Sequence, residues 1–171
     1  MQGAREVHSR SISIIDDHAF VREALGEMLS VFGFDVETHD SATGFLAKLD
    51  SDRPGCVVCD VRMPGMDGIE LVRVLRQRGV DIPIVLISGH ADVPMAVAGI
   101  KAGAHDFFEK PIDDVQLVAA INRALASGAD SDRTLAQSAE LRERLARLTP
   151  RQIEVFDLVA QGYSSAAISS L

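Results

Sequence analysis

The feature that most constrains this chain is a regular alternation of short apolar runs with segments of helical periodicity. Between the runs, apolar residues recur every three or four positions, as they do on one face of a helix. The runs cover residues 11–15, 34–38, 56–59, 82–87 and 106–109. Apolar strands separated by helices are typical of a parallel sheet with helices on both faces. We therefore predict an α/β fold with a five-stranded, doubly wound parallel sheet.

The predicted helices carry recognisable start and stop signals. Asp67 and Glu70 have the spacing of a capping box, and Asp113 opens the last helix of this region in a similar way. Gly33 ends the first helical pattern. The other predicted helices cover residues 19–32, 42–50, 71–78 and 92–102. Segment 92–102 is rich in Ala and Gly, so we expect this helix to bury little surface and to be the easier one to move.

Beyond residue 127 the alternation gives way to helical patterns alone. A polar stretch precedes a helical segment with a leucine stripe, and Thr149-Pro150 then opens another helix. We place an α/β domain at 10–127, a helical linker at 128–147 and a short all-α segment at 148–171. The leucine stripe fits either a solvated linker or a short coiled coil at a dimer interface. We favour the linker, because the stripe is too short for a sustained heptad pattern.

Composition and charge exclude several classes of protein. With 47% hydrophobic and 25% charged residues, the chain matches an ordinary globular protein rather than a disordered one. No apolar run approaches the ~20 residues that cross a bilayer, and the N-terminus lacks the apolar core of a secretory signal. Seventeen basic and 25 acidic residues give a net charge of −8, so no strongly basic surface for nucleic acid is expected. These features favour a cytoplasmic protein without a membrane segment.

The cysteines and most histidines do not form a convincing metal or redox motif. Cys56 and Cys59 resemble half of such a motif, but strand residues three positions apart point to opposite faces of a sheet. We therefore predict two separate thiols in the core. Four scattered histidines are interpreted as surface or loop residues rather than ligands: His8, His39, His90 and His105.

Polar residues stand where four of the predicted strands end, and this placement carries the functional prediction. The residues are Asp16, Asp17, Asp60, Ser88 and Lys110. The carboxyl ends of parallel strands meet at one edge of the sheet, where ligands bind in such folds. Three neighbouring carboxylates repel one another unless a cation neutralises them, and Mg²⁺ prefers such oxygen ligands. The sequence therefore predicts a magnesium site beside a lysine.

A metal and a lysine beside carboxylates suit phosphoryl transfer, because both cations stabilise charge on the phosphoryl oxygens. An aspartate can accept the phosphoryl group covalently, and Ser88 can donate a hydrogen bond to it. Two other interpretations are less favoured. One is a buried Asp–Lys ion pair with incidental neighbours. The other is a phosphatase of the dehalogenase type, in which the nucleophile ends the first strand rather than the third.

Four motifs in order resemble the receiver domain of two-component response regulators. They are the Asp16-Asp17 pair, DVRMPGMDG at 60–68, SGH at 88–90 and KAGAHDFFEKP at 101–111. The resemblance covers roughly residues 10–127, is closest to the FixJ-type branch, and implies a flavodoxin-like fold. The tail LTPRQIEVFDLVAQGYS resembles the start of a LuxR/FixJ-type helix-turn-helix domain.

The resemblance implies a role for each residue of the predicted site. Asp60 would accept the phosphoryl group from a sensor histidine kinase. Asp17, Asp60 and the backbone carbonyl of Arg62 would bind Mg²⁺, with Asp16 acting through water. Lys110 would hold a phosphoryl oxygen and precede a cis proline. Ser88 and Phe107 would be the switch residues, altering the face formed by residues 92–109, through which two receivers would pair.

The sequence departs from the commonest pattern of that family at several positions. Ser88 replaces the usual Thr, and Phe107 replaces the commoner Tyr. His18 follows the acidic pair where many members have a third acid, and Ile112 replaces a Phe. The helix-turn-helix domain of the family has four helices, whereas this sequence ends within the second. We therefore expect specific DNA binding only from a full-length form. The competing interpretation is a stand-alone receiver that acts as a phosphate sink or a protein-interaction module.

Overall fold

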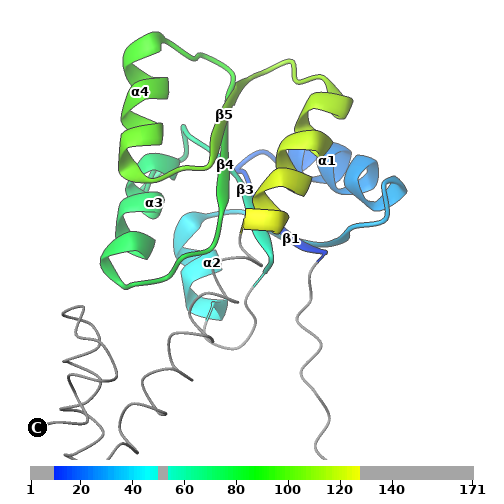
Figure 1. The fold of residues 1–171 in the computed structure, drawn as a ribbon, viewed down its shortest axis with the longest axis horizontal. Helices are drawn as coiled ribbons and strands as arrows, with labels where there is room; N and C mark the ends of the chain where they lie inside the picture. Colours follow the sequence, from blue (N-terminus) through cyan, green and yellow to red (C-terminus); the bar gives the residue numbers. More distant parts are fainter. Residues whose placement is uncertain (1–9, 50–53, 128–171) are drawn as a thin grey trace, which may run out of the picture. The chain divides into compact units, whose positions relative to one another are not determined.

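The computed structural model describes residues 10–49 and 54–127, in which the five predicted strands form one parallel sheet (Figure 1). The strands are β1 (Ser11–Ile15), β2 (Asp35–His39), β3 (Cys56–Asp60), β4 (Ile84–Ser88) and β5 (Asp106–Glu109). They lie in the order β2-β1-β3-β4-β5, and every pairing is parallel. The predicted fold class is therefore confirmed. The linker and the all-α segment predicted at 128–147 and 148–171 lie outside the described residues.

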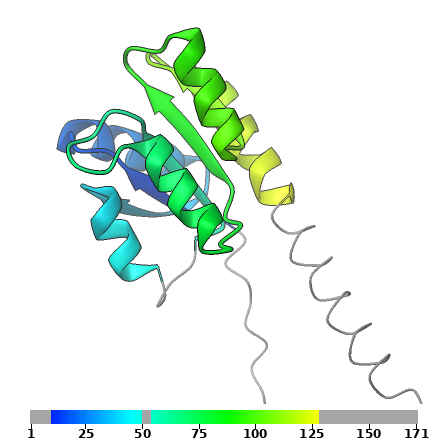
Figure 2. The ribbon, with the colours of Figure 1, turned by 90° about the vertical axis from the view of Figure 1, so that its left-hand side faces the viewer.

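Helices cover both faces of the sheet, as the alternation of apolar runs predicted. They are α1 (Ala19–Val31), α2 (Ala42–Lys48), α3 (Gly68–Gln77), α4 (Val93–Ala102) and a further helix over residues 114–127. Figures 1 and 2 show α2, α3 and α4 on one side of the sheet, and α1 with helix 114–127 on the other. None of the helices among the described residues is long and apolar enough to span a bilayer.

The helix starts follow from short polar side chains that accept backbone hydrogen bonds. Asp67 Oδ1 accepts from the Glu70 amide at 2.7 Å, and Asp113 Oδ1 accepts from Gln116 at 2.9 Å. Each bond satisfies one of the amides that a helix leaves unpaired at its N-terminus, which typically stabilises the helix by about 1 kcal/mol. The predicted helix starts at these two positions are confirmed.

The two cysteines lie on opposite faces of β3, as predicted. Cys56 belongs to the apolar cluster beneath α1 and helix 114–127, whereas Cys59 belongs to the cluster beneath α2 and α3. Both thiols are free and buried. Burial raises the pKa of Cys56 to about 12, which leaves the sulfur protonated and unreactive at neutral pH. The interpretation as two core thiols holds.

His39 corrects the prediction that it is a surface or loop residue. It is the last residue of β2 and is buried, and its ring meets Phe45 edge-to-face at 5.3 Å between centroids. Its Nε2 atom is buried and has no hydrogen-bond partner among the described residues. His39 lies on the face of β2 that meets α2, whereas Asp35 and Glu37, which alternation places on the same face, are exposed.

The burial of His39 predicts a pH-dependent stability. Burial lowers the pKa of His39 below 6.5; Glu37 and Asp40 oppose this effect, whereas Lys48 adds to it. The unfolded chain therefore takes up a proton more readily, and the free energy of unfolding should fall as pH decreases through about 6.5. Urea unfolding between pH 7.5 and 5.5 would measure the slope. His39→Gln should reduce it, whereas His90→Gln, at an exposed histidine, should not. Equal slopes in all three proteins would contradict this assignment.

Gly68 is required where α3 approaches the end of β3. A Cβ at this position would lie 2.5 Å from the backbone oxygen of Asp60, and the Gly68 amide donates to the Val61 carbonyl at 2.9 Å. Backbone cannot yield as a flexible side chain can. We expect Gly68→Ala to lower the free energy of unfolding by about 1–3 kcal/mol.

Gly89 supplies the matched control for that substitution, because a Cβ there meets no described atom within 4 Å. Gly89→Ala should change stability by under about 0.5 kcal/mol. Denaturant unfolding of both variants measures the difference. Two equally small effects would mean that the start of α3 adjusts freely.

Candidate functional site

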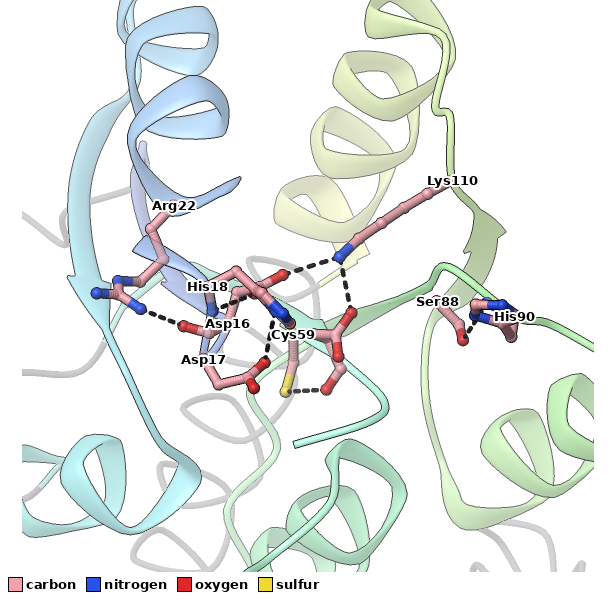
Figure 3. Close-up of polar contacts among 9 residues, drawn as sticks. Asp16, Asp17, His18, Arg22, Cys59, Ser88, His90 and Lys110 are labelled. Carbon is pink, nitrogen blue, oxygen red and sulfur yellow. Dashed lines mark hydrogen bonds and ion pairs between the residues drawn. The ribbon is translucent and has the colours of Figure 1, made fainter. Parts of the chain in front are cut away.

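Three residues from separate parts of the chain meet at the carboxyl edge of the sheet (Figure 3). The Lys110 ammonium donates to Asp16 Oδ2 at 2.9 Å and to Asp60 Oδ1 at 2.8 Å. The Asp16 side chain is fully buried, and that of Asp60 is 7% exposed. Charged groups this deeply buried need charged partners, and both carboxylates share the Lys110 ammonium.

The strand order explains why these three side chains meet. β1 and β3 are neighbours, with Ile15 opposite Cys59, so Asp16 and Asp60 both follow paired positions. Lys110 follows β5, and its backbone amide donates to the Ser88 carbonyl at 2.8 Å. The Lys110-Pro111 peptide bond is cis, as expected. Lys110 therefore reaches the acidic pair across β4.

The surroundings of Asp60 and Lys110 shift the pKa of each group. Burial raises the pKa of Asp60, and Asp16 adds to this rise, whereas the hydrogen bond from Lys110 opposes it. Burial alone would lower the pKa of Lys110, but its hydrogen bonds to Asp60 and Asp16 outweigh that effect and raise it. Lys110 is thus held in its charged form, and the pocket combines excess negative charge with one fixed cation.

Asp17 contributes the third carboxylate and has a different environment. Its Oδ1 atom is buried and accepts no hydrogen bond from the described residues. The Nδ1 atom of His18 lies 3.0 Å from it. A buried carboxylate oxygen without a hydrogen-bond donor destabilises a folded protein unless a cation is bound there. The oxygen donors of this pocket therefore fit a hard divalent ion such as Mg²⁺.

Ser88 and Phe107, the predicted switch residues, are not part of this cluster. Ser88 is fully buried at the end of β4, and its Oγ accepts from the His90 amide at 3.3 Å. Phe107 lies on β5, packs against the core beneath α3, and is only partly buried. Ser88 ends β4 at the carboxyl edge of the sheet, whereas Phe107 lies opposite Leu86, farther from that edge. No hydrogen bond joins Ser88 to the acidic residues within the described ranges. Their predicted roles remain proposals.

One contact at the site was not anticipated from the sequence. The guanidinium of Arg22 donates to the backbone carbonyl of Asp16 at 2.6 Å (Figure 3). Arg22 lies in the first turn of α1, one helical turn after His18, so its side chain can reach back to the preceding loop. An arginine at that position has no distinctive sequence signal, because most helix arginines face solvent.

The shared ammonium predicts a stability effect for Lys110→Met. This substitution leaves two buried carboxylates without their cation. Because the Lys110 side chain is 25% exposed, we expect a loss below that of a fully buried pair, about 1–3 kcal/mol at pH 7.5 without added metal. The loss should shrink at acid pH as Asp60, whose pKa is raised by burial, becomes protonated. Urea unfolding measures both effects.

Lys48→Met is the control for that prediction. Lys48 makes an exposed ion pair with Glu37 at 3.2 Å, and such pairs contribute under about 1 kcal/mol. If the two lysine variants lost the same free energy of unfolding, Lys110 would not be needed to stabilise the two buried carboxylates.

Comparisons with known proteins agree with this geometry. The response regulator receiver domain family matches residues 12–122. The transcriptional regulatory protein FixJ of Rhizobium meliloti is 42% identical over 163 residues, covering 93% of this chain and 78% of that protein. The response regulator protein TodT of Pseudomonas putida is 40% identical, covering 94% and 72%.

Solved structures give the same result. Full-length FixJ from B. japonicum is 39% identical, with a TM-score of 0.68 over 94% of this chain and 79% of that one. The response regulator StyR is 36% identical, with a TM-score of 0.78 over 94% and 81%. The chain therefore belongs to the response regulator receiver domain family and is a FixJ-like regulator of the two-component type.

Proposed function

We propose that Asp60 is the phosphoacceptor of this regulator and takes its phosphoryl group from a phosphohistidine of a sensor histidine kinase. The observation that carries this proposal is the Lys110 ammonium 2.8 Å from the buried Asp60 carboxylate. Asp60 ends β3, which lies at the centre of the sheet between β1 and β4. A carboxylate is seldom buried there for stability alone, because its desolvation is unfavourable.

The reaction exchanges the phosphorus–nitrogen bond of the donor for a phosphorus–oxygen bond to Asp60. A carboxylate oxygen of Asp60 forms a bond to phosphorus, while the phosphorus–nitrogen bond of the donor breaks and its electron pair returns to the imidazole. Lys110 stabilises the negative charge on the phosphoryl oxygens, as fixed cations do in phosphoryl transfer. The same pocket would later admit water and hydrolyse the acyl phosphate. The protein is therefore a phosphoacceptor switch with self-catalysed steps rather than a turnover enzyme.

Asp17, Asp60 and the backbone carbonyl of Arg62 would hold Mg²⁺, with Asp16 contributing through water. The buried Oδ1 atom of Asp17, which accepts no hydrogen bond from the described residues, supports this assignment. The ion would neutralise the acidic pocket and let an anionic phosphoryl group approach. Lys110 alone supplies one positive charge against three carboxylates, so a divalent ion balances the site.

The switch would act through Ser88, Phe107 and α4. The Ser88 hydroxyl accepts one hydrogen bond and donates none to the residues that the structure describes, so its proton could be donated to a phosphoryl oxygen. Its movement toward Asp60 would open space into which the Phe107 ring can turn. A Cβ on Gly99 of α4 would lie 3.4 Å from the Phe107 ring, so the ring packs closely against this helix.

The altered face, residues 92–109, would pair two receivers. Three apolar side chains of α4 are exposed there: Val93, Val97 and Ile100. The predicted linker helix would extend this homodimer. Relatives with matching sequence are named transcriptional regulatory proteins, so the output of this regulator would be DNA binding in the cytoplasm.

Asp60→Asn tests the phosphoacceptor assignment. An amide oxygen cannot form the acyl phosphate, so labelling by acetyl phosphate with Mg²⁺ should be abolished, as measured by intact mass spectrometry. Asp67→Asn is the matched control, because Asn caps the start of α3 as well as Asp does. The control should gain the mass of one phosphoryl group. Persistent labelling of Asp60→Asn would show that another residue is the acceptor.

A further inference from the structure

His18 is turned toward the acidic pair rather than toward its own helix. It occupies the residue before α1, where a side chain commonly caps the helix, yet it makes no capping bond. Its Nδ1 atom lies 3.0 Å from Asp17 Oδ1 and 3.4 Å from Asp16 Oδ1 (Figure 3). The ring is 70% exposed, so it is accessible to ions in solution.

A hydrogen bond does not explain the shorter of these distances. Asp17 Oδ1 accepts no hydrogen bond from the described part of the chain, although His18 Nδ1 is only 3.0 Å away. The two atoms form an ion pair if the imidazole is protonated. A neutral imidazole instead presents a lone pair on Nδ1 beside the carboxylate oxygen, and both atoms can then face a common ion.

The spacing of the donor atoms fits coordination of one ion. Ligands about 2.1 Å from a metal lie about 3.0 Å apart at a right angle and about 3.4 Å apart at the tetrahedral angle. The two distances from His18 Nδ1 agree with these values. One ligand atom from each of Asp16, Asp17 and His18 lies within 4.8 Å of the others. Asp60, whose Oδ1 is bonded to Lys110, is not a member of this group.

The chemistry of the donors points to an ion other than magnesium. Mg²⁺ prefers oxygen ligands and keeps several waters, whereas an imidazole nitrogen with carboxylates suits Zn²⁺ and Co²⁺. The two nearby thiols are buried in the core and are not available as ligands.

We propose that His18 gives the acidic pocket a second metal specificity, binding Zn²⁺ through its Nδ1 atom together with Asp17 and Asp16. The consequence rests on the proposed function, because Asp17 is also assigned to Mg²⁺. Zn²⁺ held by His18 would compete with Mg²⁺ for that carboxylate and would suppress the phosphorylation of Asp60. The residue that replaces the commoner third acid would thus make this regulator sensitive to zinc.

Metal titrations of the full chain test the proposal. Zn²⁺ affinity is measured by calorimetry, and Co²⁺ is followed by its visible absorption, which reports nitrogen ligation. His18→Gln should weaken Zn²⁺ and Co²⁺ binding by about tenfold or more, as expected for loss of a ligand. His90→Gln, the control at an exposed histidine, should leave both unchanged. Asp60→Asn should keep Zn²⁺ binding while weakening Mg²⁺ binding.

The outcomes distinguish the zinc proposal from the proposal that Asp60 is a Mg²⁺-dependent phosphoacceptor. Equal Zn²⁺ affinity in wild type and His18→Gln, or no Zn²⁺ binding by the wild type, overturns the role of His18 and leaves the phosphoacceptor proposal intact. Wild type that binds Zn²⁺ but not Mg²⁺ overturns the magnesium assignment instead. If His18→Gln fails to fold, NMR of the wild type decides, because Zn²⁺ should shift the imidazole resonances of His18 and not those of His90.

Discussion

The Lys110 ammonium between two buried carboxylates is the interaction on which the rest of this structure depends. Asp60 ends β3, whereas Asp16 and Lys110 follow β1 and β5, so the three charges meet only when the sheet has the order observed. Burying any one of them alone would be strongly unfavourable. The site is therefore coupled to the fold. The apolar clusters on both faces of the sheet supply the stability that offsets its desolvation.

Residues whose position follows from strand periodicity were predicted correctly from the sequence. A polar residue directly after an apolar strand must lie at the sheet edge, which placed Asp16, Asp60 and Lys110 together before any coordinates. The opposite faces of Cys56 and Cys59 follow from the same alternation. Strand limits were less certain: β4 begins at Ile84 rather than at residue 82, because Pro83 provides no amide for the sheet.

Features that depend on side-chain direction could not be predicted in the same way. His39 was misjudged because β2 is an edge strand of mixed polarity, in which the sequence does not reveal the inward face. The contact of Arg22 with the Asp16 carbonyl depends on a long side chain turning back along α1. The orientation of His18 toward Asp17 depends on the loop after β1, in which the His18 amide donates to Asp16 Oδ1 at 2.8 Å. Such contacts are decided by packing, and sequence periodicity carries no information about them.

The distribution of burial also bears on how the proposed switch would operate without unfolding the domain. Only Gly99 of α4 is buried, whereas α3 buries Leu71, Val72 and Leu75. The two ends of α4 nevertheless differ. Arg76 of α3 donates to the Gly103 carbonyl at 3.0 Å and to Val80 at 2.7 Å, which ties the C-terminal end of α4 to the loop before β4. At the N-terminal end Val93 is exposed, and Met95 packs against the core, but no side-chain hydrogen bond to a neighbouring element is found there among the described residues. A small movement at Ser88 or Phe107 would therefore displace that end while the core stays packed.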